Sequence, residues 1–315
     1  MLSRVADSLY WMSRYLERSE HLARLIEVNL NLMLDHSATP AERRWRHVLE
    51  CMGHSPSADV PLDTHRVVQT WCADPANRSS IVSCITSARE NARQVREQIS
   101  SEMWEQLNRL FHEVRRAGLE ESWESEPMAF LAAVQEGSWL FQGITNAMMN
   151  HGEGWHFIRL GRYIERALNL TTLLDVHFAA IAPGAADAHI EWLGLLKSAS
   201  AFEAYCKVHT ADLKPERIAE FLLLNAEFPH SIRFAIDALQ NSLHAISEHA
   251  PPRKSAHLER LAGRLRAALS YSPIEEIMFG GLHSYLENIR RQCAQIHTAL
   301  FEVYITYAIE SALEA

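Results

Sequence analysis

Arg14-Tyr15-Leu16-Glu17-Arg18 and Arg162-Tyr163-Ile164-Glu165-Arg166 carry the same R-Y-x-E-R pattern, 148 residues apart in a chain of 315 residues. That separation is close to half the chain length. Apolar residues that flank the two copies correspond at the same offset, as Leu22 does with Leu170. Because a long period with flanking similarity indicates duplicated units, we expect two pseudo-repeats, residues 1–150 and 151–315.

Helical periodicity runs through both copies of the pattern. Apolar residues recur at steps of three and four from Leu2 to Met33 and again from Phe157 to Ile181. This spacing is typical of a helix that packs an apolar stripe against a partner. Further helices are expected near residues 42–52, 64–73, 78–98, 100–117, 127–149, 187–209, 214–225, 229–248, 254–269 and 274–311.

The fold class that follows is all-α. Alternating β-branched segments bounded by hairpin turns are missing from the sequence. Only the short turn Asn150-His151-Gly152-Glu153-Gly154 separates the two halves, without a linker rich in Gly, Pro or Ser. We therefore expect a single domain over residues 1–315, a helical bundle built from two pseudo-repeats that share one core.

Composition bounds the function. The net charge of −9 argues against binding to nucleic acid or to an anionic membrane, because both need a basic surface. The five cysteines form no C-x-x-C pair and are typical of reduced thiols inside a cell. A signal peptide is not recognisable, and the apolar runs are too short to span a bilayer. The sequence therefore predicts a soluble, cytoplasmic protein.

The charged residues of each R-Y-x-E-R copy share one face of a helix, because they stand at positions i, i+3 and i+4. Large apolar residues such as Trp11 and Leu22 flank the first copy, so its charges are expected to be desolvated. An unpaired buried charge is costly, so each arginine needs a carboxylate or another anion. The planar guanidinium can bind a carboxylate or a phosphate with two hydrogen bonds.

Three interpretations of these charges stay open. Arg18 can pair with Glu165 and Arg166 with Glu17, which would lock the two halves in register. Alternatively, the surplus of arginine over glutamate leaves a pocket for a carboxylate or phosphoryl group. Plain surface ion pairs are the third possibility. In the pocket interpretation the glutamates orient the arginines or act as a general base, and the ligand-binding residues are Arg14, Arg18, Arg162 and Arg166.

Two further segments are candidates for the same site. Arg89 and Arg93 lie one turn apart in Ala88-Arg89-Glu90-Asn91-Ala92-Arg93, either as a second wall of an anion site or as a solvated helix face. The corresponding segment, residues 239–244, has lost the charges, which favours a functional role slightly. His156, just before the second R-Y-x-E-R copy, is a further candidate ligand contact.

Metal and cofactor signatures are missing from the sequence. A helical di-metal site needs paired E-x-x-H motifs, and the E-x-x-H of Glu227 to His230 contains a proline. No Walker A loop, dinucleotide fingerprint or local nucleophile signature occurs. We therefore expect no metal ligands and no cofactor.

In combination, the motifs resemble the alpha-E domain family, an all-helical bacterial domain named for its ER motif. The resemblance covers essentially the whole chain. Its departure is Asn225, where the family commonly has an aspartate. The segments that carry the resemblance are Ser3 to Met12 leading into Arg14 to Arg18, Ala88 to Arg93, Gly154-Trp155-His156-Phe157 leading into Arg162 to Arg166, and Phe221-Leu222-Leu223-Leu224-Asn225 followed by Phe228-Pro229.

The resemblance implies which proteins the chain works with, and says less about the reaction that it takes part in. Members of the family look like partners of circularly permuted ATP-grasp proteins, and some lie near transglutaminase-like proteins. ATP-grasp enzymes make amide bonds through acyl-phosphate intermediates. The expected function is an accessory or co-catalytic subunit of a peptide-ligase or amidoligase system with a peptide or amino-acid ligand. The alternatives are an enzyme that itself acts on an acyl-phosphate or aminoacyl intermediate, and a purely structural protein in which the motifs staple helices.

Overall fold

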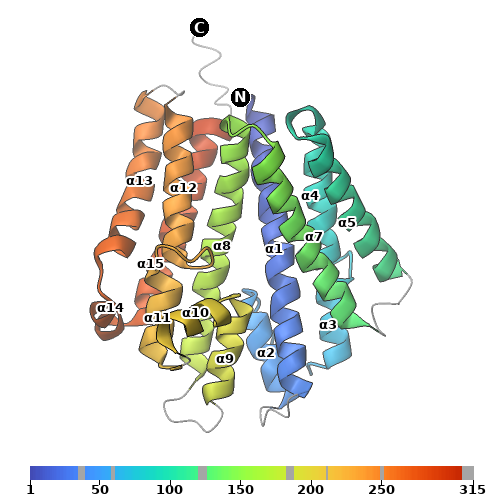
Figure 1. Cartoon of the computed structure of the whole chain (residues 1–315), viewed down its shortest axis with the longest axis vertical. Helices are drawn as coiled ribbons and strands as arrows, with labels where there is room; N and C mark the ends of the chain where they lie inside the picture. The colour runs from blue at the N-terminus through green and yellow to red at the C-terminus, as the bar shows by residue number, and fades with distance from the viewer. Residues whose placement is uncertain are drawn as a thin grey trace.

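Two long helices, α1 (Ser3–Leu34) and α8 (Glu153–Ala180), lie side by side through the middle of the molecule (Figure 1). The computed structural model describes residues 1–34, 40–57, 61–119, 126–181, 188–210, 212–248 and 252–306. Throughout these ranges the regular secondary structure is helical and no strand occurs, so the all-α prediction is confirmed.

The remaining helices surround this central pair. The α-helices are α2 (Ala41–Cys51), α3 (Thr64–Cys72), α4 (Ile81–Gln94), α5 (Ser101–Leu119), α7 (Pro127–Met148), α9 (Ala188–Ser198), α10 (Phe202–His209), α11 (Pro215–Leu224), α12 (Ile232–Ser247), α13 (Pro252–Tyr271), α14 (Ile274–Gly280) and α15 (Leu282–Leu300). The 3-10 turn η1 (Arg96–Gln98) follows α4, and the π-turn η2 (Phe301–Ile305) continues α15. Among the described residues, no helix combines the length and apolar character that a membrane crossing requires.

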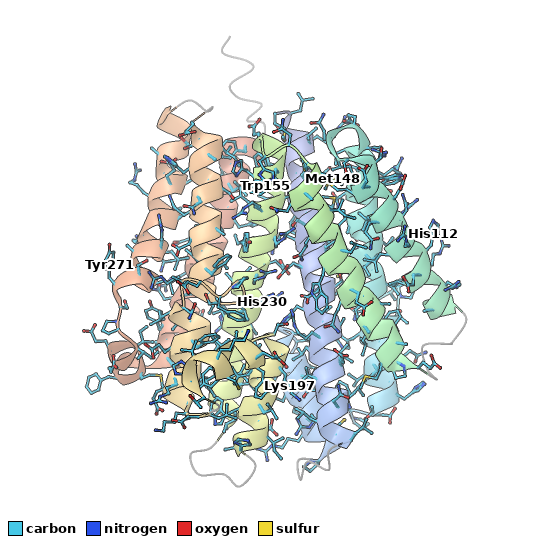
Figure 2. The ribbon with its side chains drawn as sticks, viewed as in Figure 1. His112, Met148, Trp155, Lys197, His230 and Tyr271 are labelled. Atoms are coloured by element: carbon cyan, nitrogen blue, oxygen red, sulfur yellow. The ribbon has the colours of Figure 1, made fainter. Side chains whose placement is uncertain are left out.

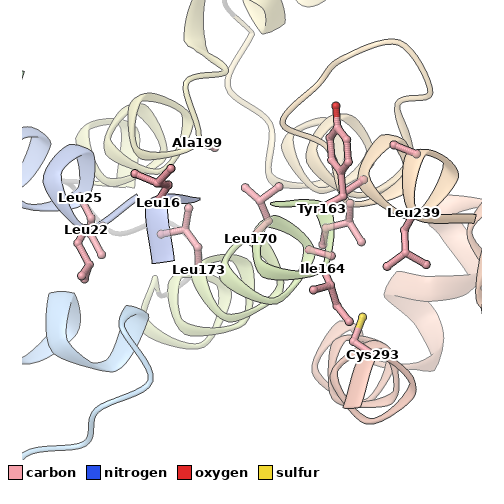
Figure 3. Packing of buried hydrophobic residues seen from close by; sticks show 14 of the residues in the cluster. Leu16, Leu22, Leu25, Tyr163, Ile164, Leu170, Leu173, Ala199, Leu239 and Cys293 are labelled. Atoms are coloured by element: carbon pink, nitrogen blue, oxygen red, sulfur yellow. The ribbon is translucent and has the colours of Figure 1, made fainter. Parts of the chain in front are cut away.

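Each central helix has its own covering layer (Figure 1). Helices α4 and α7 pack on α1, and α5 packs on both of them. Helices α12 and α15 pack on α8, and α13 packs on both of those. Because α1 and α8 are covered on several sides, their apolar residues occupy more than one stripe, and side chains such as Leu16, Leu170 and Leu173 fill the space between them (Figure 3).

Local sequence signals explain where several helices begin. The hydroxyl of Ser80 accepts a hydrogen bond from the backbone N–H of Ser83 at 3.2 Å and caps α4. Ser231 caps α12 in the same way, with its hydroxyl 3.0 Å from the N–H of Phe234. Such caps satisfy backbone donors that have no partner within the helix. Pro127 stands in the first turn of α7, where its missing N–H is harmless.

Two helices predicted as continuous are broken, and those two predictions were wrong. The expected helix 187–209 is divided at Ser200, which has a left-handed φ of 52°. The N–H of Ala201 bonds to the carbonyl of Leu196 at 2.7 Å, which closes a left-handed cap at the end of α9. That conformation usually needs glycine, so a serine at this position does not signal the end of a helix.

The expected helix 274–311 is divided at Gly281, which has a φ of 96°. Here the pair Gly280-Gly281 was a readable stop signal, because glycine adopts this backbone at little cost. Residues 307–311 of the prediction lie outside the described residues. The predicted helix 78–98 is also shorter, since α4 ends at Gln94 and a single 3-10 turn follows.

Backbone contact fixes how closely the two central helices approach. A Cβ built on Gly161 of α8 would lie 2.1 Å from the carbonyl oxygen of Tyr10 in α1. No side chain larger than hydrogen fits at that separation. The glycine therefore sets the point at which α1 and α8 touch.

We predict that Gly161→Ala destabilises the protein by about 1–3 kcal/mol or more, because the added methyl must push the two backbones apart. Urea unfolding measures the change. The matched control is Gly143→Ala in α7, where a Cβ meets nothing within 4 Å. That control should be neutral or stabilising by about 0.5–1 kcal/mol. Equal stability of the two variants would contradict the close contact.

Candidate functional site

Charged side chains cross between α1 and α8 near the middle of both helices. We call Arg14, Glu17, Arg18, Arg162, Glu165 and Arg166 the ER cluster. Nε of Arg14 donates to Oε2 of Glu165 at 2.7 Å, and Nε of Arg18 donates to Oε1 of the same carboxylate at 2.7 Å. One glutamate of α8 thus binds two arginines of α1.

An arginine of α8 likewise binds a glutamate of α1. Arg166 donates to Glu17 through Nε at 2.6 Å and through Nη2 at 3.0 Å. The predicted pairing of Arg18 with Glu165 and of Arg166 with Glu17 is confirmed. Both glutamates and Arg166 are buried, so these are interior ion pairs and not the surface pairs of the third interpretation.

Burial and neighbouring charge act in opposite directions on these groups. Burial alone would raise the pKa of Glu165, but Arg14 and Arg18 outweigh it and hold that pKa below its ordinary value. Burial opposes protonation of Arg166, and the Glu17 carboxylate nevertheless raises the pKa of Arg166. Glu165 and Arg166 therefore keep their charged forms at neutral pH.

Arg162 differs from the other arginines of the cluster. It is half-buried, and within the described ranges it makes no hydrogen bond or ion pair. Its counterpart in the first pentapeptide, Arg14, binds Glu165. Burial lowers the pKa of Arg162; among its neighbours, Tyr163 and Glu17 favour its charged form, whereas Arg166 disfavours it. A guanidinium stays protonated under such conditions, so the arrangement favours an added anion.

A second buried ion pair adjoins the cluster, and the sequence analysis did not identify it. Arg24 donates to Glu20 through Nη2 at 2.6 Å, and Nε1–H of Trp139 in α7 donates to Glu20 at 3.0 Å. Arg24 also donates to the carbonyl of Ser198 at 3.0 Å and to the hydroxyl of Ser200. The signal was present in the i, i+4 spacing of Glu20 and Arg24.

The segment between α11 and α12 also reaches the cluster. The carbonyl of Pro229 accepts a hydrogen bond from Nη1 of Arg166 at 3.0 Å. Oδ1 of Asn225 accepts from the N–H groups of Glu227 and Phe228 at 2.9 and 2.8 Å, which fixes the turn. Asn225 therefore orders the backbone that holds Arg166, a role for which an amide oxygen suffices.

Two histidines near Arg24, His21 and His230, are held neutral. Burial is the main cause that lowers the pKa of His21 to about 3, and Arg24 adds to it. Burial also lowers the pKa of His230 well below its ordinary value, with Arg166 and Arg24 contributing. Nε2 of His21 has no hydrogen-bond partner among the described residues. Figure 2 places His230 near the middle of α8.

The other predicted site residues lie elsewhere. Nε of Arg89 donates to Oδ1 of Asn108 in α5 at 2.6 Å, and Arg93 forms an exposed ion pair with Glu90 at 2.6 Å. The exposed Arg93 thus matches the solvated helix face, whereas the half-buried Arg89 is held against α5, where its guanidinium lies 4.5 Å from the ring centre of Phe111. His156 stands in the first turn of α8, and its Nδ1 has no partner among the described residues. Burial lowers the pKa of His156, and the nearby Arg159 contributes.

We predict that Glu165→Gln lowers the free energy of unfolding near pH 7 by about 3–5 kcal/mol, because Arg14 and Arg18 lose their carboxylate. The folded-state pKa of Glu165 lies below its ordinary value of 4.5. Its ionised form therefore stabilises the fold above pH 4.5, and this contribution is lost as the pH falls through the folded-state value. Urea unfolding at a series of pH values from 7 downward measures both effects.

The control for this prediction is Glu113→Gln on α5, where the carboxylate is exposed. We expect its stability to stay within about 0.5 kcal/mol of the unmodified chain. The Glu165 variant should lose less stability than the unmodified chain on acidification below pH 4.5. Parallel pH profiles for all three proteins would contradict the assigned role of Glu165.

Comparisons with known proteins place this arrangement in a family. Curated relatives include an uncharacterised protein of Mycobacterium bovis, 26% identical over 95% of this chain and 36% of its own length. An uncharacterised protein of Mycobacterium tuberculosis strain H37Rv is 25% identical over the same shares. This chain therefore spans about a third of the length of these relatives. No solved structure matches it.

A family model described as a predicted alpha-helical domain with a conserved ER motif matches residues 1–305. The match includes both pentapeptides and every described helix. The resemblance on which the sequence analysis relied is therefore confirmed, and the chain belongs to the Alpha-E family.

Proposed function

We propose that the ER cluster binds a carboxylate or phosphoryl group, and that the chain serves an ATP-grasp peptide-ligase or amidoligase system as an accessory or co-catalytic subunit. The observation that carries the proposal is Arg162. This half-buried cation stands beside the Glu17–Arg166 ion pair and makes no hydrogen bond or ion pair with any described residue.

The charge balance of the cluster supports an anionic ligand. Its four arginines face two glutamates, and Glu165 already serves both Arg14 and Arg18. Glu17 accepts both of its ion-pair hydrogen bonds from Arg166. His21 and His230 are neutral, so neither adds to the positive charge of the cluster nor offsets it. The excess of positive charge lies in partly desolvated surroundings, where attraction to an anion is stronger than in water.

The position of Arg162 on α8 suits an incoming group. Arg159, Arg162 and Arg166 lie on one face of the helix at positions i−3, i and i+4. The guanidinium of Arg159 stacks 4.6 Å from the ring centre of Trp155 and 5.1 Å from that of Tyr163. Figure 2 places Trp155 near the upper end of α8. A guanidinium on such a face can bind a carboxylate or a phosphate with two hydrogen bonds.

In this proposal the two glutamates orient the arginines. Both oxygens of Glu165 are occupied by Arg14 and Arg18, and its lowered pKa makes it a weak base. Oε2 of Glu17 accepts from Arg166 and also lies 3.4 Å from Nε2 of Gln142. Held in this way, the carboxylates keep the guanidiniums in place before the ligand arrives.

The partner is proposed from the family resemblance. An acyl phosphate carries both a phosphoryl group and an acyl group derived from a carboxylate, which are the two groups that guanidiniums bind. The curated relatives are far longer than this chain, so their Alpha-E-like part lies within a larger protein. Both points are consistent with a helical module that works beside a ligase.

We also infer an internal duplication, in which residues 1–150 and 151–315 derive from one unit. Ser80 caps α4, which packs on α1, and Ser231 caps α12, which packs on α8. The crosswise ion pairs between α1 and α8 support the same relation.

We predict that Arg162→Gln leaves the thermal unfolding temperature unchanged or raises it, because it removes a cation that burial disfavours. The same variant should weaken binding of inorganic phosphate or acetate at least about tenfold, which corresponds to the loss of a charge-assisted hydrogen bond worth about 1.5–3 kcal/mol. Isothermal titration calorimetry with each anion measures the affinity.

Two variants separate binding from a purely structural role. Arg166→Gln should cost about 3–5 kcal/mol of stability, because it leaves Glu17 buried without its counter-ion. Arg291→Gln, at an exposed position of α15, is the neutral control. An Arg162 variant that binds both anions as tightly as the unmodified chain would contradict the proposed ligand site.

The partner is tested separately. The chain would be co-expressed with a candidate ATP-grasp protein, copurified, and examined by mass spectrometry for bound small molecules. We expect copurification of the unmodified chain and of the Arg162 variant, with the bound anion missing from the latter. Failure of both to copurify would argue against the ligase partner while leaving the anion site intact.

A further inference from the structure

Two histidines and a cysteine meet between α2 and α8, away from the ER cluster. His47 and Cys51 stand one turn apart on α2, and His177 faces them from α8. One ligand atom from each of the three residues lies within 4.8 Å of the others. His177 is eleven residues beyond Arg166, or about 16 Å along the helix axis.

The distances approach those of a metal site. Sγ of Cys51 lies 3.6 Å from Nδ1 of His177, and the two imidazole rings have centres 4.3 Å apart. Sulfur and nitrogen bound to one tetrahedral zinc ion are about 3.5 Å apart, given metal–ligand bonds of about 2.3 and 2.1 Å. The three ligand atoms therefore need to close by roughly 1 Å to share an ion.

Hydrogen bonding leaves a ligand atom available on His47. Nδ1 of His177, the nitrogen that lies near Sγ of Cys51, is 2.9 Å from the carbonyl oxygen of Leu173, and coordination through this nitrogen would replace that hydrogen bond. Nε2 of His47 is buried and has no hydrogen-bond partner among the described residues. A buried nitrogen without a partner is unfavourable, and a bound ion would satisfy it.

We propose that His47, Cys51 and His177 bind a divalent transition metal ion, with Zn²⁺ as the preferred ion. A thiolate with two imidazoles is a ligand set that suits zinc and not magnesium or calcium. The Cys51 thiol gives up its proton to solvent as the metal–sulfur bond forms.

Charged side chains near His47 and Cys51 act in both directions on a bound cation. Arg43 and Arg44 lie on the same side as His47 and disfavour a cation. Glu191 acts on His47 in the opposite sense, and the Glu50 carboxylate adjoins Cys51. The thiolate removes one further positive charge, so the bound ion adds a net charge of about +1. Three protein ligands leave the fourth tetrahedral position for water or a small ligand.

The test uses Co²⁺ as a spectroscopic probe of the whole chain, purified with chelator and kept reduced. We expect one Co²⁺ per chain, a thiolate-to-cobalt charge-transfer band in the near ultraviolet, and displacement of the band by Zn²⁺. Zn²⁺ should also raise the thermal unfolding temperature, since it binds the folded state. Cys51→Ser should abolish the band and weaken Zn²⁺ binding at least about tenfold.

The matched control is Cys72→Ser, which alters another buried cysteine outside the three-residue group. The Cys72 variant should retain the thiolate-to-cobalt band and the Zn²⁺ affinity of the unmodified chain. His47→Gln gives a second variant at a half-buried position, in case the buried serine of the first prevents folding, and it should also weaken binding. Absence of metal binding by the reduced chain, or a band that survives both Cys51→Ser and His47→Gln, would overturn the proposal.

Discussion

Crosswise ion pairs between α1 and α8 hold the two central helices together, and the other helices pack around this pair. Each helix provides a buried glutamate to arginines of the other helix. A buried charge that loses its partner is strongly destabilising. If α1 and α8 separated, the charges of the ER cluster would have to be left unpaired or be exposed to water. The covering layers of helices keep water out and so make the pairing obligatory.

Neighbouring segments extend this constraint outward. Arg166 is held by the Pro229 carbonyl, and the turn that presents this carbonyl is ordered by Asn225. Arg24 connects α1 to the end of α9 through Ser198. The left-handed residue Ser200 ends α9 and supplies a hydroxyl to the same arginine. Loops that look unremarkable in the sequence therefore belong to one polar network around the central pair.

Much of this could be read from the sequence, because it depends on local periodicity and local chemistry. The helical spacing around the pentapeptides, their burial and the pairing of Arg18 and Arg166 with the opposite glutamates all follow from side chains on one helix face. The break at Ser200 could not be read, because a left-handed serine leaves no compositional signal. Partners such as Trp139 depend on how distant helices pack, which a single sequence does not encode locally.

The three-residue group between α2 and α8 was missed for a related reason. His47 and Cys51 have a readable i, i+4 spacing, but His177 is far away along the chain. Sequence patterns for metal sites rely on Cys and His ligands that are near in sequence, or on sets of carboxylate ligands from several helices. Two ligands on one helix and a third on another satisfy neither criterion.

The contact of Gly161 with the Tyr10 carbonyl has a consequence for alignment. If α8 advanced by one residue along its own screw, Leu160 or Arg162 would face that carbonyl, where no side chain fits. Steric exclusion at this point therefore favours the alignment of α8 in which Glu165 and Arg166 meet their partners on α1.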